Sequence, residues 1–113
     1  MSYDDMDAYF YQKQAIGQRF KQFRELLGKS IKEIVEEANE PMIQEQRIKL
    51  LEKGTFIPDI LFIQYFTEEY GLNLTWLVKG IGPIFFKKGP KTPGNIKMKK
   101  IREQQKGGQN GQL

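Results

Sequence analysis

Apolar residues recur at helical spacing in five separate stretches of the chain. In residues 15–27 they follow one another at intervals of four, three and four, which places them on one helical face. These residues are Ile16, Phe20, Phe23 and Leu27. Gly28 then predicts a left-handed helix end. The pattern therefore indicates a first helix over residues 15–27.

A second helix is predicted over Ile31–Ala38 by its end signals. Ser30 and Glu33 have the spacing of a capping box, in which each side chain satisfies a free backbone amide at the start of a helix. Asn39 tolerates a left-handed backbone and can close the helix at its other end. The sequence thus defines this segment from both sides.

A third helix is predicted over residues 42–53. Pro41 favours the first turn of a helix, where its missing amide costs nothing. Lys53 suits the negative end of the helix dipole, and Gly54 stops the helix. The two short helices would therefore meet at a tight break.

Two further helices complete the prediction. Pro58 would occupy an early position of a fourth helix, which is apolar over much of its surface and runs to about Tyr70. Asn73 or Thr75 would cap a short fifth helix that stops at Gly80. The fold class predicted is all-α.

The positive charge of the chain is concentrated at one end. Residues 87–113 hold eight Lys or Arg and one Glu, a net +7, whereas residues 15–86 hold nine Lys or Arg and ten Asp or Glu, a net −1. Residues 1–14 carry a net −2. We therefore predict an N-terminal extension (1–14), a globular domain (15–86) and a disordered basic tail or linker (87–113). The near-neutral domain gives no charge argument for nucleic-acid binding.

Composition excludes several classes of function. The chain has neither cysteine nor histidine, which removes the usual thiol nucleophile, the commonest general base and the commonest metal ligands. We predict that the protein is not an enzyme and uses no metal or cofactor. No stretch is long and apolar enough for a membrane span, and Asp4, Asp5 and Asp7 do not fit a signal sequence. These features favour a cytoplasmic protein without a membrane partner.

Three local patterns in this order resemble the lambda-repressor-like (XRE-type) helix-turn-helix family. The first is Arg24-x5-Ser30-x-x-Glu33, and the second is Leu51-Glu52-Lys53-Gly54 followed by Pro58. The third is Asn73-Leu74-Thr75-Trp76-Leu77-Val78-Lys79-Gly80 with Gly82-Pro83-Ile84-Phe85, which is similar to phage and mobile-element repressors. The resemblance covers residues 16–86 and implies a compact five-helix DNA-binding domain.

The resemblance implies a repressor-like transcriptional regulator that binds double-stranded DNA as a homodimer. The residues it places at bases are Gln44, Glu45, Gln46, Arg47 and Lys49. Candidate phosphate contacts are Lys29, Lys32, Lys53, Lys97, Lys99, Lys100 and Arg102. The resemblance further implies a structural salt bridge between Arg24 and Glu52, and a dimer surface at Trp76, Phe85 and Phe86.

Two departures from the family pattern keep alternatives open. Ile31 replaces a glutamine that binds phosphate, and residues 40–42 are surplus, so they either extend the third helix or lengthen the loop before it. The polar face of the third helix is also what any solvated helix presents. Trp76, Phe85 and Phe86 are most simply explained as core or core edge, and the tail is equally explained as a solubilising linker. The alternative function is a protein-interaction module, antitoxin-like or an anti-repressor partner.

Overall fold

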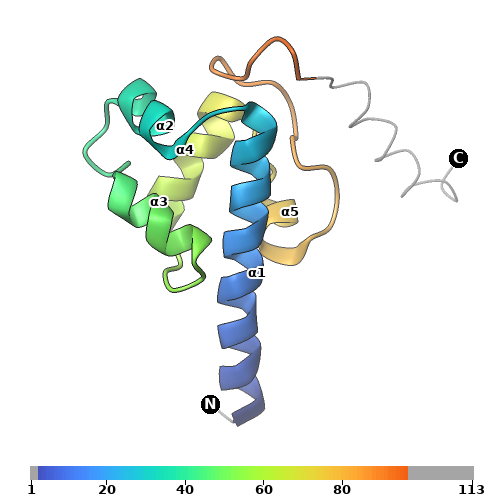
Figure 1. Ribbon diagram of the computed structural model, residues 1–113. Helices are drawn as coiled ribbons and strands as arrows, with labels where there is room; N and C mark the ends of the chain where they lie inside the picture. Colours follow the sequence, from blue (N-terminus) through green and yellow to red (C-terminus); the bar gives the residue numbers. More distant parts are fainter. Residues whose placement is uncertain (1–2, 97–113) are drawn as a thin grey trace, which may run out of the picture. The chain divides into compact units, whose positions relative to one another are not determined.

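The structure is a computed structural model that describes residues 3–96, with side chains from residue 12 onwards (Figure 1). Its helices are α1 (Tyr3–Leu27), α2 (Ile31–Ala38), α3 (Glu45–Glu52), α4 (Ile60–Tyr70) and α5 (Leu74–Lys79). The described residues contain no β-strand, only an isolated antiparallel bridge between Leu72 and Phe85. The predicted all-α class is confirmed. The chain divides within α4 into two units, the first ending at Phe62 and the second beginning at Ile63.

The core of the first unit is built on the carboxyl-terminal half of α1. The four apolar residues predicted on one face of this helix are all buried. The ring of Phe20 lies 5.5 Å from that of Phe23 and 6.5 Å from that of Phe62, measured between centroids. Helix α3 packs against both α1 and α2 through Ile48 and Leu51, which are fully buried. This packing fixes one face of α3 and leaves the other in solvent.

Helix α1 ends where the sequence predicts, but it begins at Tyr3 instead of residue 15. Gly28 follows it in the left-handed region at φ 71°. The residues before position 15 contain neither glycine nor proline, so nothing interrupts the helix. Aspartates in the first turn also favour a helix start through the dipole.

Helix α2 has the predicted bounds and the predicted caps. The Ser30 hydroxyl accepts a hydrogen bond from the backbone N–H of Glu33 at 3.1 Å, and the Glu33 carboxylate accepts one from the N–H of Ser30 at 3.0 Å. Asn39 closes the helix in the left-handed region at φ 49°. Both end signals are therefore confirmed.

The predicted start of α3 at residue 42 is wrong, because the helix begins at Glu45. Pro41 lies in a turn closed by the N–H of Ile43, which donates to the carbonyl of Glu40 at 3.0 Å. This turn carries the Ile43 side chain into the core, where only 1% of it is exposed. The surplus residues therefore lengthen the loop, residues 39–44, and do not extend the helix.

Helix α4 begins two residues after Pro58, which precedes the helix and does not occupy its first turn. Asp59 lies between Pro58 and the helix. Its carboxylate accepts a hydrogen bond from the backbone N–H of Phe62 at 2.9 Å. A side-chain oxygen that accepts from the backbone N–H three residues later is the usual geometry of an N-cap. The cap of α4 is therefore Asp59 and not Pro58.

The second unit contains the end of α4, α5 and the chain that follows. Asn73 is the cap of α5, since its side-chain oxygen accepts the N–H of Thr75 at 3.1 Å, and Gly80 ends the helix at φ 74°. The Asn73 amide also donates to the carbonyl of Pro83 at 2.8 Å. The aromatic rings of Tyr65, Phe66 and Tyr70 contact one another with centroid distances of 5.1–6.2 Å.

Residues 87–96 are hydrogen-bonded to the end of α4, so a disordered tail beginning at residue 87 is wrong for this segment. The N–H of Lys91 donates to the carbonyl of Glu69 at 2.7 Å, and the Thr92 hydroxyl donates to that of Tyr70 at 2.7 Å. The Lys91 ammonium lies 5.1 Å from the centre of the Tyr65 ring. Carbonyls at the end of a helix lack intrahelical partners, and this segment supplies them. The rest of the predicted tail, residues 97–113, lies outside the described residues.

Within residues 3–96, no helix has the length and apolar character needed to cross a membrane.

Candidate functional site

The candidate site is the pair α2 and α3 with the loop between them, supported by α1. Ile34 and Ala38 of α2 and Ile48 and Leu51 of α3 are buried, so both helices present their polar faces outward. A six-residue connection, residues 39–44, joins the two helices. The amino-terminal turn of α3 lies next to that connection.

A bidentate ion pair joins α1 to the end of α3. The Arg24 Nε donates to Glu52 Oε2 at 2.7 Å, and its Nη2 donates to Oε1 at 3.0 Å. The two side chains are only 15% and 9% exposed. The hydrogen bond from Arg24 to Glu52 raises the pKa of the guanidinium above its usual value, against an opposing effect of burial. The predicted structural salt bridge is confirmed.

The same guanidinium has a third partner that the sequence did not predict. Its Nη1 donates to the backbone carbonyl of Lys29 at 2.9 Å. Lys29 precedes Ser30, the cap of α2, so Arg24 contacts the start of α2 and the end of α3 together. No sequence signal identifies this bond, because any residue supplies a backbone carbonyl.

The five predicted base-contacting residues all lie on or beside the first turns of α3. Gln44, Glu45, Gln46 and Lys49 are exposed, whereas Arg47 is half-buried. Four of the five interact within the chain. Gln44 Nε2 donates to the carbonyl of Pro41 at 2.9 Å, and Lys49 Nζ lies 3.3 Å from a carboxylate oxygen of Glu45.

Arg47 is the half-buried member of this set, and it also bonds the loop before α3. Its Nη1 donates to the carbonyl of Met42 at 3.3 Å, across five residues. A guanidinium carries five N–H donors, so this bond leaves donors for a ligand. Arg47 therefore combines a structural contact with capacity for recognition, which its sequence position alone did not indicate.

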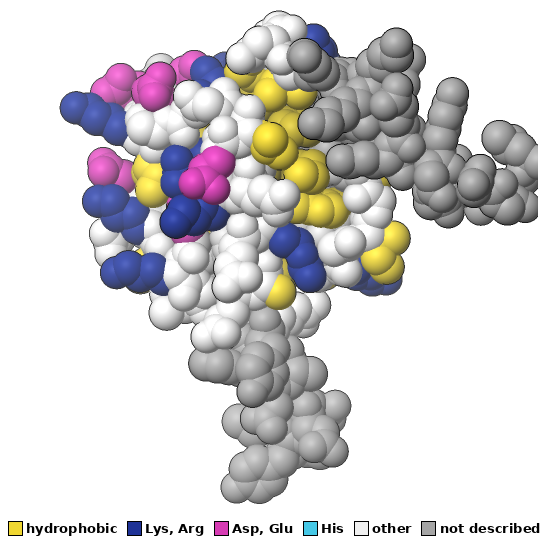
Figure 2. Space-filling view, turned by 45° about the vertical axis from the view of Figure 1, so that its right-hand side comes forward, with side chains coloured by type: hydrophobic (Ala, Val, Ile, Leu, Met, Phe, Trp, Pro, Cys, Tyr) yellow, Lys and Arg dark blue, Asp and Glu magenta, His cyan; other side chains and the backbone are white. Residues whose placement is uncertain are grey.

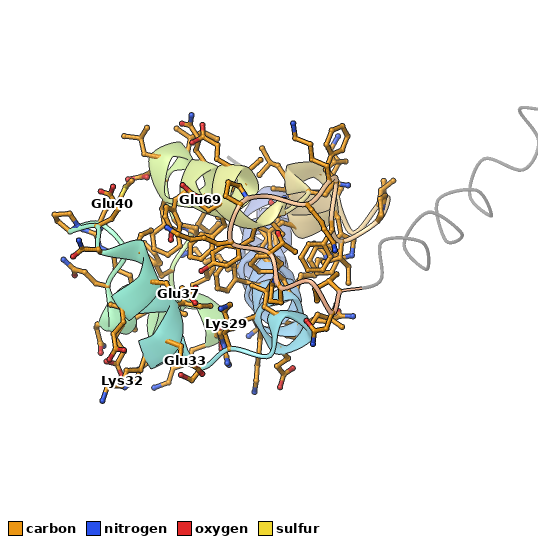
Figure 3. All side chains as sticks on the ribbon, turned by 90° about the horizontal axis from the view of Figure 1, so that it is seen from above. Lys29, Lys32, Glu33, Glu37, Glu40 and Glu69 are labelled. Atoms are coloured by element: carbon orange, nitrogen blue, oxygen red, sulfur yellow. The ribbon has the colours of Figure 1, made fainter. Side chains whose placement is uncertain are left out.

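The predicted phosphate contacts are in different environments. Lys29 forms an ion pair with Glu37 across α2, and Lys32 and Lys53 are exposed. Figure 3 shows Lys32, Glu33 and Glu37 on α2, with Glu40 in the following loop. The remaining predicted contacts, Lys97, Lys99, Lys100 and Arg102, lie outside the described residues.

The charge of this region is mixed and slightly negative. Residues 29–53 hold five Lys or Arg and six Glu, a net −1. On the face shown in Figure 2, Lys and Arg side chains stand beside Asp and Glu side chains. Hydrogen bonds with Ser30 lower the pKa of Glu33 below its usual value. The backbone of Ser30 has the larger effect and its side chain the smaller one. Recognition of an anion here would depend on individual side chains and not on a positive field.

The three residues predicted for a dimer surface differ in how much of each is exposed. Trp76 and Phe85 are 8% and 1% exposed, which fits the alternative that they belong to the core. Phe86 is 71% exposed. Burial of Trp76 and Phe85 gives no support to a dimer surface at these two residues, and only Phe86 is accessible.

Among the described residues, no group of three or more His, Cys, Asp or Glu side chains is placed to hold a metal ion. No protein-family model, no curated protein and no solved structure matches the chain. The resemblance to the lambda-repressor-like family stays a prediction from local motifs.

Proposed function

We propose that the protein is a sequence-specific DNA-binding transcriptional regulator that reads the major groove with the amino-terminal turns of α3. One observation carries the proposal. Buried Ile48 and Leu51 anchor α3, while Gln44, Glu45 and Gln46 at its amino end are exposed. A helix that reads a groove needs this combination of a fixed body and a polar, accessible first turn.

The exposed side chains have suitable chemistry for direct readout. Glutamine can bond adenine in bidentate fashion, arginine can do so with guanine, and glutamate can accept from cytosine. Gln46 and the remaining donors of Arg47 would take the first two roles. Lys32 and Lys53 would contact phosphates, which fix the position of the protein without reading sequence.

The ion pair of Arg24 with Glu52 supports the proposal by restricting α3. Because the same guanidinium also bonds the carbonyl of Lys29, the two helices of the motif share one anchor on α1. A rigid support lowers the conformational entropy that a reading helix loses on binding. The same anchor would hold α3 equally well for another macromolecular partner, so DNA has to be tested directly.

The test is selection of the full chain on a random DNA duplex library, followed by titration of the enriched site at increasing salt. A regulator should enrich a motif, palindromic if a homodimer reads two half-sites, and its affinity should fall steeply with salt. Gln46→Ala should relax one base position at a cost of about 1–3 kcal/mol. Gln22→Ala, at an exposed position of α1, is the matched control and should leave the motif unchanged.

Removal of residues 97–113 should weaken binding to all sequences alike, because phosphate contacts carry no sequence information. Residues 87–96 stay in this variant because they are bonded to α4. Failure to enrich a motif, with binding lost only on this deletion, would refute sequence-specific readout by α3.

A second candidate function is a protein-interaction module built on the same helix-turn-helix. The net −1 of residues 29–53 favours it, since Glu40 and Glu45 beside the first turn of α3 would repel phosphates. The two functions differ in one measurement. Glu40→Gln should strengthen DNA binding if DNA is the partner, and should leave weak, non-specific binding unchanged if it is not.

A further inference from the structure

The chain that follows α5 is fixed by hydrogen bonds to the segment that precedes this helix. The N–H of Asn73 donates to the carbonyl of Ile84 at 2.9 Å, and the N–H of Phe86 donates to that of Gly71 at 2.7 Å. The side-chain amide of Asn73 also donates to the carbonyl of Pro83, at 2.8 Å. These bonds hold the backbone after α5 in one extended conformation.

The side chains of this segment alternate between the interior and solvent. Pro83 and Phe85 are buried, whereas Phe86 is 71% exposed and Ile84 is half-buried. Successive residues of an extended chain point to opposite sides, so Ile84 and Phe86 share the outer side. Ile81, which stands between two exposed glycines, is 62% exposed. The segment therefore presents large apolar side chains to water although its backbone is held in place.

Lysines flank these apolar side chains, and no carboxylate accompanies them in the sequence. Lys79, Lys87 and Lys88 are all exposed. Residues 70–96 contain four lysines but no arginine, aspartate or glutamate. The region after α5 is therefore both positively charged and apolar at its surface. We call the following residues the α5-loop surface: Lys79, Ile81, Ile84, Phe86, Lys87 and Lys88.

We infer that the α5-loop surface binds an anionic phospholipid bilayer. Stable contact with such a bilayer takes two features together: apolar side chains that enter the boundary between headgroups and acyl chains, and basic side chains near the lipid phosphates. Ile81 and Phe86 supply the first feature, and Lys79, Lys87 and Lys88 supply the second. Lysine suits this position, because its flexible stem lies along apolar groups while its ammonium stays among the headgroups.

The composition of the α5-loop surface argues against other partners. A second copy of the chain would set lysines against lysines, with no carboxylate between them. DNA would attract the lysines, but its phosphate backbone offers little apolar surface to Ile81 and Phe86. Protein and nucleic-acid interfaces favour arginine over lysine, and residues 70–96 contain no arginine. An anionic bilayer is the partner that satisfies the apolar side chains and the lysines together.

Contact of this kind takes place at the surface of the membrane and needs no spanning helix. The sequence prediction of no membrane partner rested on the lack of a span and of a signal sequence, and neither bears on surface contact. The α5-loop surface shares no residue with α2, α3 or the loop between them. The inference therefore does not depend on what α3 binds.

The first test is co-sedimentation of the full chain with vesicles of phosphatidylcholine, alone or mixed with phosphatidylglycerol. Binding should need the anionic lipid and should weaken as salt rises, because salt screens the lysines. Phe86→Ser should weaken binding by about tenfold or more, since it removes the most exposed apolar side chain of the surface. Leu61→Ser is the matched control, because Leu61 is 59% exposed and lies on α4. It should change binding by less than about twofold.

The second test separates the lysines of this surface from the net charge of the chain. Lys87→Gln combined with Lys88→Gln should weaken binding to anionic vesicles by about tenfold or more. Lys21→Gln combined with Lys32→Gln removes the same charge from exposed positions of α1 and α2, and should weaken binding by about threefold or less. The positive charge of residues 97–113 is the same in all these variants. Circular dichroism of each variant checks that the fold is intact.

Four results would overturn the proposal. The first is no binding of the wild-type chain to anionic vesicles at low salt. The second is binding that Phe86→Ser leaves unchanged, which would show attraction of charges without insertion. The third is an equal effect of the two double substitutions, which would make net charge the cause. The fourth is a dimer, or a complex with an acidic amphipathic peptide, that Phe86→Ser dissociates while vesicles stay unbound, which would assign the surface to a protein partner.

Discussion

Helices α2 and α3 are neighbours of equal length, eight residues each, yet they are held by different kinds of interaction. Helix α2 begins with the reciprocal bonds of Ser30 and Glu33 and ends at Asn39, so its own sequence defines both ends. Helix α3 begins at Glu45, after Gln44, whose side chain does not cap it. Its last residue, Glu52, bonds to Arg24, which lies 28 positions earlier. Local signals determine one helix and tertiary contacts determine the other.

This difference predicts that substitutions on α1 damage α3 more than substitutions within its own first turn do. The position that tests this most severely is Gly17, where α1 passes close to the carbonyl of Leu51.

Gly17→Ala should destabilise the protein by about 3 kcal/mol, because its Cβ would clash with backbone that cannot move aside easily. Helix propensity alone predicts the opposite sign, a gain of about 1 kcal/mol for alanine within a helix. Urea denaturation measures the free energy of unfolding. Gln18→Ala, at the exposed neighbouring position, should change it by less than about 0.5 kcal/mol. A stabilising Gly17→Ala would show that α1 and α3 do not approach closely.

The difference between local signals and tertiary contacts also explains which features the sequence predicts. The bounds of α2 and the end of α1 at Leu27 follow from residues within a few positions of each other, and both are confirmed. Of the two caps predicted for α5, Asn73 or Thr75, the structure has Asn73. The start of α3 could not be predicted in this way. Pro41 favours a helix start locally, but burial of Ile43 outweighs that preference and keeps residues 39–44 in a loop.

The candidate site shows the same limit. The pairing of Arg24 with Glu52 was predicted only through the family resemblance, since no local rule joins residues so far apart. The bonds of Arg24 to the carbonyl of Lys29 and of Arg47 to that of Met42 were not predicted at all. Backbone acceptors carry no residue-specific signal, so the loop geometry has to be known before such bonds can be inferred.

Glu52→Ala should destabilise the protein by about 2 kcal/mol, since it leaves the half-buried Arg24 guanidinium without its carboxylate. In a double-mutant cycle with Arg24→Ala, the coupling energy should be about 1–2 kcal/mol. Glu36→Ala is the control, because Glu36 is an exposed glutamate of α2, and its effect should be within about 0.5 kcal/mol. A coupling energy near zero would mean that the pair does not hold α3 to α1.

Ser30→Ala should cost about 1 kcal/mol, the usual effect of removing a side-chain N-cap. The equivalent substitution on the neighbouring helix, Gln44→Ala, should cost less, because the Gln44 side chain bonds Pro41 and caps no amide of α3. Hydrogen exchange locates the effect and should show faster exchange at the start of α2 only in Ser30→Ala. Equal effects of the two substitutions would contradict the distinction between the helices.

The capping box of α2 also predicts a response to pH. Because hydrogen bonds from Ser30 lower the pKa of Glu33 below the usual 4.5, the folded state binds this proton less readily than the unfolded state. The stabilising contribution of Glu33 is therefore present above pH 4.5 and is lost as pH falls through the lowered pKa. Carboxyl NMR titration should find the pKa of Glu33 below 4.5 in the wild-type protein and closer to 4.5 in Ser30→Ala. Titration of wild-type Glu33 at 4.5 or above would mean that the box does not form in solution, and that α2 depends on tertiary packing as α3 does.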